Sequence, residues 1–332
     1  MDGSGEGKVT ALLERIRASG RGKTCGWTAL DQRDVNFHPG ELTIIAGRTG
    51  HGKTTVILNL LLHWLEKYPE ERFILYSYEV PDESVYVKLI SALTRKNGVN
   101  GWTYSDIRLW LQTGSIGARA KGTLQELQAA IDYVRANQNR IEVVYQPDWN
   151  VERLAQDARV RAVREGTRPL GAIIVDYLQI VPPPDATLEN REHAVALTAR
   201  TLKRLSVSLQ TPIVSAAQIS HEASRLLDRV PEGPFVSEKV RRAIAARRPQ
   251  LHHLREGGGE QEADLVMGIL NYRADYQQAH DLEKVDYGTL GEDEASLFEV
   301  LVLKNRNGSL GLAALSFDSR TGYIRDRGLF ER

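Results

Sequence analysis

Short apolar runs recur along the chain, and longer stretches with helical spacing separate them. The runs lie near residues 42–46, 73–78, 141–145, 172–176 and 212–217. Each is about the length of a buried strand and is too short for an ordinary helix. Because parallel neighbouring strands need a helical crossover between them, this alternation predicts an α/β fold with a mostly parallel wound sheet flanked by helices.

The stretches between the runs predict the helices. Residues 84–140 are mostly helical in pattern, and a helix over 190–209 precedes the last run. Asn150 has the residue type and position of an N-cap, which predicts a helix over roughly 151–165. Residues 275–296 are rich in acidic side chains and predict an exposed loop.

The N-terminal residues differ in pattern from the rest of the chain. Residues 1–7 are rich in glycine and acidic side chains, which predicts disorder. Residues 8–18 carry apolar side chains at helical spacing and predict a short amphipathic helix, and 20–26 has the composition of a flexible joint. We therefore expect 1–25 to be a tail, a linker helix and a joint, and 26–332 to be one domain.

The composition leaves room for a large core and narrows the function only slightly. The chain has 332 residues, of which 42% are hydrophobic and 26% charged, as in ordinary globular proteins. It contains 43 basic and 43 acidic residues, so any nucleic-acid binding must come from a local patch. There is no apolar run of membrane-spanning length, and the lone Cys25 fits a reducing cytoplasm, which predicts a cytoplasmic protein without membrane contact.

The turn after the first apolar run has the P-loop spacing G-x-x-x-x-G-K-T, from Gly47 to Thr54. Its glycines allow the backbone to wrap an anion, and the helix that follows directs its positive end at the same group. Lys53 has the position to reach the β- and γ-phosphates, and the Thr54 hydroxyl the position to ligate Mg²⁺. An ordinary Gly-rich loop is the alternative, but the flanking strand and helix are the context that the motif requires. The residues expected to contact ATP here are Gly47, Thr49, Gly50, Gly52, Lys53, Thr54 and Thr55.

Polar residues follow three other apolar runs. Glu79 follows the second run, where it could orient or deprotonate the attacking water; a surface carboxylate is the alternative. Asp176 ends the buried run 172–176 in the arrangement of a Walker B motif, which delivers a carboxylate to the metal. Gln218 follows the last run and could contact the γ-phosphate.

Seven motifs, taken together and in order, resemble the ATPase domain of DnaB-type hexameric replicative helicases. They are CGWTALD (25–31), GRTGHGKTT (47–55), YSYE (76–79), IIVDYLQIV (173–181), AAQIS (216–220), LREGGGEQEADLVM (254–267) and KNRNG (304–308). DYLQ and KNRNG are far more specific than a P-loop alone. The resemblance implies a RecA-like fold and a homo-oligomeric ring, hexameric in this family, with ATP between subunits.

The resemblance also assigns roles to residues. Lys53 and Thr54 match the Walker A pair, Glu79 the catalytic carboxylate and Asp176 the magnesium carboxylate. Gln218 matches the γ-phosphate sensor. Lys304 and Arg306 match the basic pair that reaches the neighbouring subunit's site, and helix 8–18 matches the linker helix that docks on the next protomer.

The residues themselves support a role for the basic pair. Lys304 and Arg306 lie two apart at the end of an apolar strand predicted over 297–303, so both project from one face before Asn307 and Gly308 turn the chain. Two cations beside phosphate stabilise charge in phosphoryl transfer. A charged hairpin tip in solvent is the alternative.

The stretch 219–258 carries the clearest nucleic-acid signal. It is rich in arginine and ends in glycines, a composition suited to following a phosphate backbone without reading sequence. Its arginines include Arg241, Arg242, Arg247, Arg248 and Arg255. The resemblance implies that Arg255, Glu256, Gly257 and Gly258 contact single-stranded DNA. A surface helix over 237–246 with a solvated basic face is the alternative for Arg241 to Arg248.

The sequence departs from the family pattern at two places. The family carries an N-terminal domain that recruits primase, whereas this chain begins shortly before the linker helix. We expect either an excised domain or a short plasmid-, phage- or paralogue-type protein, and primase binding is not carried over. Lys88 stands where the family tends to use an arginine toward the γ-phosphate, and a lysine loses the bidentate fork.

Three functions remain open at this point. The first is an ATP-driven translocase on single-stranded DNA, a 5′-to-3′ helicase by family likeness, with a helicase loader as a further partner. The second is a RecA-fold ring ATPase with a regulatory or recombination accessory role. The third is a small-molecule P-loop kinase, which would not need the KNRNG cations from a neighbour.

Overall fold

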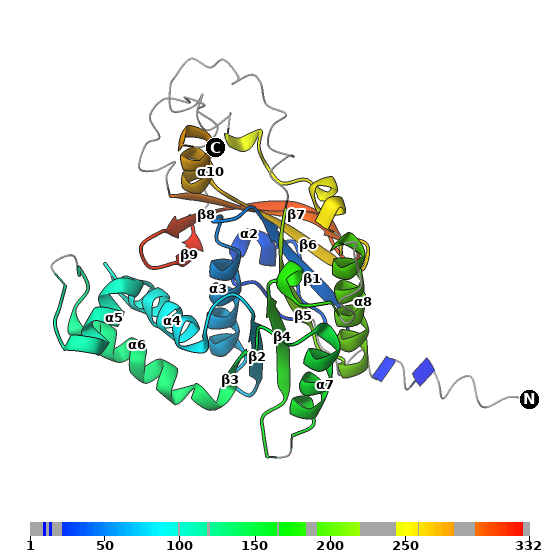
Figure 1. Ribbon diagram of the computed structural model, residues 1–332, viewed down its shortest axis with the longest axis horizontal. Helices are drawn as coiled ribbons and strands as arrows, with labels where there is room; N and C mark the ends of the chain where they lie inside the picture. The colour runs from blue at the N-terminus through cyan, green and yellow to red at the C-terminus, as the bar shows by residue number, and fades with distance from the viewer. Residues whose placement is uncertain are drawn as a thin grey trace, which may run out of the picture.

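All five apolar runs form strands, and these strands lie in one sheet (Figure 1). The structure is a computed structural model, and it describes residues 9–10, 13–14, 22–98, 100–117, 120–164, 166–183, 191–219, 244–257, 259–281 and 296–327. The five strands are β1 (Leu42–Gly47), β2 (Arg72–Ser77), β3 (Ile141–Tyr145), β4 (Leu170–Asp176) and β5 (Ile213–Gln218). They pair in parallel, as the alternation with helices predicts.

The C-terminal part of the chain extends this sheet with four more strands. They are β6 (Leu265–Asn271), β7 (Leu297–Asn305), β8 (Gly311–Asp318) and β9 (Tyr323–Asp326). The nine strands follow the order β3-β2-β4-β5-β1-β6-β7-β8-β9. β6 is parallel to β1, and the remaining pairs are antiparallel. The mostly parallel wound sheet is therefore confirmed, with an antiparallel meander that the apolar runs did not predict beyond β7.

Helices cover both faces of the sheet. One face carries α3 (Lys53–Lys67), α4 (Asp82–Asn97), α5 (Tyr104–Thr113) and α6 (Leu124–Ala136), and the other carries α7 (Val151–Ala162) and α8 (Arg191–Leu209). Two further helices are α2 (Thr28–Asp31) and α10 (Tyr272–Asp281). Short 3₁₀ helices are η1 (Gln138–Arg140), η2 (Leu178–Ile180) and η4 (Leu251–Gly257). None of the helices described is long and apolar enough to cross a membrane.

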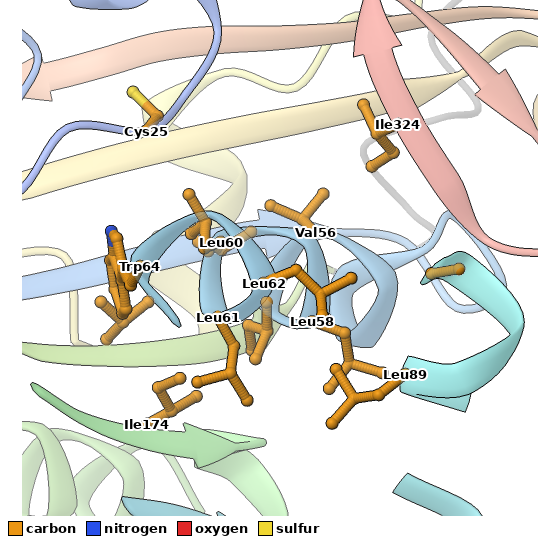
Figure 2. Packing of buried hydrophobic residues seen from close by; sticks show 14 of the residues in the cluster. Cys25, Val56, Leu58, Leu60, Leu61, Leu62, Trp64, Leu89, Ile174 and Ile324 are labelled. Carbon is orange, nitrogen blue, oxygen red and sulfur yellow. The ribbon is translucent and has the colours of Figure 1, made fainter. Parts of the chain in front are cut away.

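The helix that follows the P-loop, α3, is buried on almost every side (Figure 2). Trp64 packs edge-on against Phe37 and stacks on Phe73, with ring centroids 5.2 and 5.8 Å away. Asn59, a polar residue within this buried helix, donates to the Gly322 carbonyl and accepts from the Ile324 amide, so its amide is satisfied. A helix packed all round in this way fixes the position of the loop at its N-terminus.

Three expectations from the sequence are corrected. The acidic segment 275–296 is not a loop from its start, because α10 continues to Asp281. The helix capped by Asn150, whose side chain accepts from the Arg153 amide, ends at Ala162 and not at 165. The joint expected over 20–26 is held on the domain from residue 22, since Lys23 pairs with Phe37 and Cys25 is buried.

Several predicted segments fall wholly or largely outside the described residues. Of helix 8–18, only residues 9–10 and 13–14 are described; they are helical and exposed. The tail 1–7, the acidic residues 282–295 and most of helix 237–246 lie outside. The division into 1–25 and 26–332 stays a prediction.

Candidate nucleotide-binding site

The phosphate loop connects β1 to α3, and its glycines are required for two different reasons. Gly50 and Gly52 have φ angles of 76° and 93°, in the left-handed region that other residues rarely adopt. Gly47 has no such angle, but a Cβ there would lie 2.5 Å from Cγ1 of Ile269 on β6. The loop therefore needs glycine for its own turn and for the close approach of the neighbouring strand.

Lys53 folds back over the loop that precedes it. Its Nζ donates to the carbonyls of Gly47 and Arg48, at 3.2 and 3.1 Å. Burial lowers the pKa of Lys53 below its ordinary value, and the carboxylates of Asp176 and Glu79 partly oppose this shift. The ammonium thus lies in the concave part of the loop, where an anion would satisfy it better than neutral carbonyls do.

Asp176 and Thr54 form the second part of the site. The Thr54 hydroxyl donates to Asp176 Oδ2 at 2.7 Å, and Asp176 is only 2% exposed. Burial raises the pKa of Asp176, while the Thr54 hydrogen bond and the charges of Lys53 and Lys88 oppose this shift. The other oxygen, Oδ1, accepts no hydrogen bond from any described residue. A buried oxygen without a donor, beside a hydroxyl, fits a hard cation such as Mg²⁺.

The P-loop and the start of α3 line a cavity of about 260 Å³ at the carboxyl ends of the parallel strands. Its lining consists of Thr49, Gly50, Gly52, Lys53, Thr54, Thr55, Glu79, Tyr177 and Gln218. The predicted catalytic groups Glu79 and Gln218 are thus brought to the P-loop, as parallel strands ending at one edge require. Lys88 lies just outside, where it lines an adjoining cavity of about 180 Å³ that also contains Thr55.

Sequence reasoning missed two residues at this site, although both belong to the quoted DYLQ motif. The ring of Tyr177 lies 5.8 Å from Lys53 Nζ and forms one wall of the cavity. The Gln179 side chain donates to the Gln218 carbonyl and accepts from the Gln218 amide, both at 2.9 Å. Gln179 therefore fixes the backbone from which Gln218 faces the cavity.

A buried charged cluster supports the phosphate loop from behind. Asp275, fully buried on α10, pairs with Arg48 of the loop and with Arg247, whose Nε lies 2.8 Å from Asp275 Oδ2. His51 of the loop approaches the same carboxylate at 3.9 Å. Arg48 also donates to the Arg247 carbonyl at 2.9 Å. One carboxylate thus ties two side chains of the loop to the segment that precedes η4.

The cluster corrects the reading of two arginines as a basic surface. Arg247 is buried against Asp275, and Arg248 makes two hydrogen bonds of 2.7 Å to the Glu299 carboxylate on β7. Arg247 fits neither a DNA-facing patch nor a solvated helix face, because it is buried against a carboxylate, whereas the Arg248 side chain is 40% exposed and paired with Glu299. Arg241 and Arg242 lie outside the described residues.

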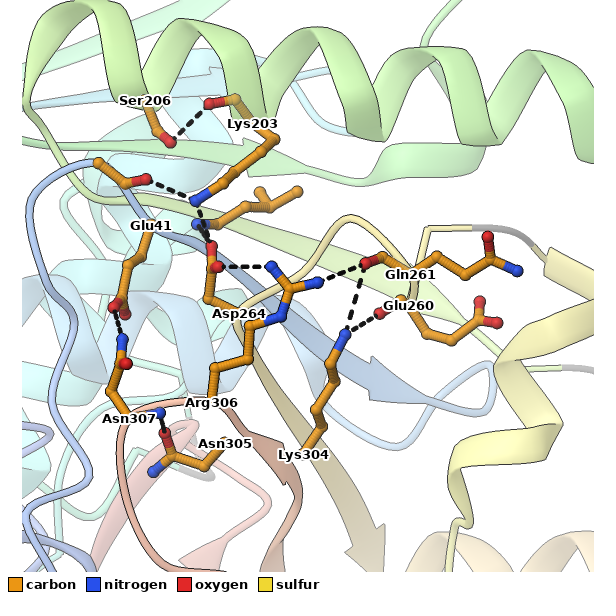
Figure 3. Close-up of polar contacts among 12 residues, drawn as sticks. Glu41, Lys203, Ser206, Glu260, Gln261, Asp264, Lys304, Asn305, Arg306 and Asn307 are labelled. Carbon is orange, nitrogen blue, oxygen red and sulfur yellow. Dashed lines mark hydrogen bonds and ion pairs between the residues drawn. The ribbon is translucent and has the colours of Figure 1, made fainter.

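Lys304 lies near the end of β7 and Arg306 directly follows that strand, at the edge of the sheet opposite the P-loop. Figure 3 shows the contacts of both side chains. Lys304 Nζ donates to the Glu260 carbonyl at 2.6 Å, and Arg306 donates to the Gln261 carbonyl at 2.9 Å and to Asp264 Oδ1 at 3.0 Å. Both cations therefore point at the same turn, as their spacing of two predicts. Neither lines the P-loop cavity.

The predicted DNA residues are described only in part. Arg255, Glu256 and Gly257 lie in η4, and their side chains are not among those described; Gly258 lies outside. Their assignment to DNA stays a prediction.

A P-loop, a buried carboxylate opposite its threonine and a mostly parallel wound sheet define the class of the molecule: it is a RecA-like P-loop domain. The model of the DnaB-like helicase C-terminal domain matches residues 22–238 and 236–326. The chain belongs to that family, which confirms the resemblance.

Individual relatives agree with this assignment. The replicative DNA helicase DnaC of Bacillus subtilis is 26% identical over 293 residues, which cover 88% of this chain and 54% of that protein. DnaB of Haemophilus influenzae is 28% identical over 318 residues, covering 94% and 57%. The chain thus spans about half the length of these relatives. The ATPase domain of G40P has the same fold, with a TM-score of 0.71, 20% identity and coverage of 98% and 99%.

The Asp275 cluster generates a prediction about stability. Asp275→Asn removes the anion shared by two buried arginines, and breaking a buried pair in this way typically costs about 3–5 kcal/mol. We expect a loss of that size in the free energy of unfolding, measured by urea denaturation. Asp132→Asn, which affects only exposed contacts with Arg135 and Gln128, should change it by less than about 1 kcal/mol. Equal effects of the two substitutions would show that the cluster does not stabilise the fold.

Proposed function

We propose that this chain is an ATP-hydrolysing ring translocase on single-stranded DNA, the motor part of a replicative-type 5′-to-3′ DNA helicase. One observation carries the ATPase part: Lys53, Thr54, Glu79 and Gln218 line a single cavity, and Asp176 accepts a hydrogen bond from the Thr54 hydroxyl beside it. The replicative helicases among its relatives supply the DNA part. Because the chain spans only part of those proteins, their whole activity is proposed here.

In this proposal the residues in and beside the cavity have separate roles in ATP binding and hydrolysis. Gly50, Gly52 and the α3 amides would bind the phosphates, with Lys53 at the β- and γ-phosphates. Thr54 and Asp176 would hold Mg²⁺, which supplies charge neutralisation of the phosphate oxygens when bound. Glu79, exposed at the end of β2, would orient the attacking water and accept its proton. Gln218, on a backbone fixed by Gln179, would contact the γ-phosphate.

The sheet register supports the assignment of Arg306 to a neighbouring subunit's site. Thr43 of β1 pairs with Leu265 of β6, and Leu265 pairs with Asn305 of β7, so Arg306 lies level with the start of β1. The P-loop follows the other end of β1 at Gly47. Four residues of strand span roughly 13 Å, and β6 lies between the two strands. A cation placed there cannot serve its own P-loop, whereas it can serve one presented by another copy.

Exposed apolar residues support the ring. Val9 and Leu13, on the described parts of predicted helix 8–18, are exposed, so these two apolar side chains are uncovered within the subunit. Leu109 and Leu111 on α5, Ile116 after it and Leu124 on α6 are exposed as well. We place the docking site of a neighbour's linker helix on this second set.

The remaining parts of the proposal rest on the family. Arg255, Glu256, Gly257 and Gly258 would follow the DNA backbone in a ring channel, a helicase loader would be a further partner, and the protein would work in the cytoplasm. A regulatory or recombination accessory ring would use the same ATP site, so only strand separation distinguishes it. The kinase alternative is disfavoured, because Lys304 and Arg306 lie away from the P-loop of their own chain.

The P-loop assignment is tested by Lys53→Ala. The substitution removes a phosphate ligand and no core volume, so the variant should fold and lose nearly all ATP hydrolysis. Lys67→Ala, which removes an exposed lysine from the far end of α3, is the matched control and should keep wild-type turnover. Wild-type turnover of Lys53→Ala would remove the P-loop from the mechanism.

The DNA assignment is tested by salt dependence. If η4 follows phosphates, Arg255→Ala should weaken single-stranded DNA binding about equally for any sequence and lower the salt slope by about one contact. The measurement is the affinity for two unrelated oligonucleotides at several salt concentrations. Arg135→Ala on α6 is the control and should leave the affinity and the salt slope unchanged. An unchanged salt slope for Arg255→Ala would mean that Arg255 is a solvated surface residue that does not contact DNA phosphates.

The two-subunit mechanism is tested by mixing variants. Arg306→Ala should fold, bind ATP and lose roughly 10³–10⁵ in turnover, the usual contribution of an arginine supplied in trans. Mixing it with Lys53→Ala should restore some activity, because one type of interface then keeps both residues. Normal turnover of Arg306→Ala, or of a strictly monomeric wild type, would contradict the ring mechanism.

A further inference from the structure

The two oxygens of the Asp264 carboxylate contact different groups (Figure 3). One accepts hydrogen bonds from the rest of the domain, and the other accepts from Arg306, which we call the finger because it is proposed to act in a neighbouring subunit's site. Oδ2 accepts from the Leu42 amide at 2.9 Å and from Lys203 Nζ of α8 at 2.7 Å. Oδ1 accepts from Arg306 Nη1 at 3.0 Å. The Asp264 side chain is 8% exposed, whereas that of Arg306 is 48% exposed. The Asp264 carboxylate, which is fixed by β1 and α8, therefore binds one edge of the half-exposed Arg306 guanidinium.

We propose that Asp264 is the positioning residue of the Arg306 finger: it holds the guanidinium at the geometry in which its exposed part meets the phosphate of a neighbouring subunit. The inference rests on the proposed function and assigns the residue that makes Arg306 effective. Arginine has many rotamers in solution, and transition-state stabilisation requires a donor that is already in place.

The surrounding contacts favour positioning over a mere surface ion pair. Arg306 is fixed at three atoms, since its backbone amide donates to the Asp264 carbonyl and Nη2 donates to the Gln261 carbonyl. Asp264 cannot turn away, because its other oxygen has two donors of its own. An isolated exposed pair would have neither restraint.

The same turn connects the finger to the proposed DNA segment. The carbonyls of Glu260 and Gln261 accept hydrogen bonds from Lys304 and Arg306. These two residues follow the end of η4 by a few positions in the chain. A displacement of η4 would therefore move the acceptors that hold both cations. The acceptors of both cations therefore lie next to the proposed DNA segment in the chain.

Asp264→Asn is the substitution that separates Arg306 from its anchor. An amide has one acceptor oxygen, which Leu42 and Lys203 retain, so an NH₂ group faces the guanidinium and cannot accept from it. We expect kcat for ATP to fall by about 10- to 100-fold, as for a misplaced catalytic group, with KM changed little. Glu262→Gln is the matched control: it removes a carboxylate of the same turn, paired with Arg200 at 3.0 Å, and should keep wild-type kcat.

Mixing identifies the site at which Asp264 acts. Asp264→Asn subunits keep a complete P-loop, so mixing them with Lys53→Ala subunits should restore turnover at interfaces where the latter supply Arg306. A defect in folding or in the subunit's own site would not be rescued in this way. An unchanged or raised kcat in Asp264→Asn, or a reduced kcat without rescue, overturns the proposal.

The test remains separable from that of the two-subunit mechanism. If Arg306→Ala is inactive and Asp264→Asn has normal turnover, the role of Arg306 in trans is supported and the positioning role of Asp264 is contradicted. If Arg306→Ala is itself active, the role of Arg306 in trans is contradicted, and with it the proposed function on which this inference rests. The double variant Asp264→Asn/Arg306→Ala should be no slower than Arg306→Ala alone, because both act through one guanidinium; a further large loss would show an independent role for Asp264.

Discussion

The parallel pairing of β1 determines where the phosphate loop lies relative to the other groups proposed to bind the nucleotide. β1 lies between β5 and β6, so the P-loop that follows Gly47 is adjacent to Gln218 at the end of β5. β4 pairs in parallel with β5, so Asp176 at its end lies at the same edge of the sheet. There its Oδ2 is 2.7 Å from the Thr54 hydroxyl oxygen. β7 runs in the opposite direction, so its C-terminal end, with Lys304 and Arg306, reaches the other edge. One sheet thus separates the groups that would bind a nucleotide from the cations that would serve another subunit.

The segment from Arg247 to Asp264 is bonded to both of these regions. At its start, Arg247 shares the buried Asp275 with the phosphate-loop residue Arg48. At its end, Asp264 and the turn before it hold Arg306 and Lys304. η4, which carries the proposed DNA contacts, lies between these attachments. Binding along this segment would therefore bear on the subunit's own P-loop and on the cations offered to its neighbour.

Much of the site could be predicted because its chemistry is local in the sequence. The P-loop spacing identifies Lys53 and Thr54, and apolar runs that end in a polar residue identify Asp176 and Gln218. The mostly parallel wound sheet followed from the alternation of short runs with helical stretches, but its strand order did not. β6 was not predicted, although Leu265–Asn271 is buried along its whole length, as β1 and β2 are.

The misreadings concern partners that are distant in the chain. Arg247 and Arg248 have the composition of a basic patch, but Asp275 and Glu299 neutralise them, and no sequence spacing reveals such pairs. Asp275 itself was taken as part of an acidic loop, since an exposed and a fully buried carboxylate look alike in a sequence. Tyr177 and Gln179 could have been predicted as site residues, because both belong to the quoted motif DYLQ.

We propose that ATP turnover at the P-loop is coupled to single-stranded DNA through a multi-subunit assembly. The most direct measurement is the steady-state ATPase rate of the wild-type chain, titrated with single-stranded DNA at several protein concentrations. We expect the rate per subunit to rise steeply with protein concentration and to increase further when single-stranded DNA is added. A rate per subunit that is independent of both protein and DNA concentration would contradict it.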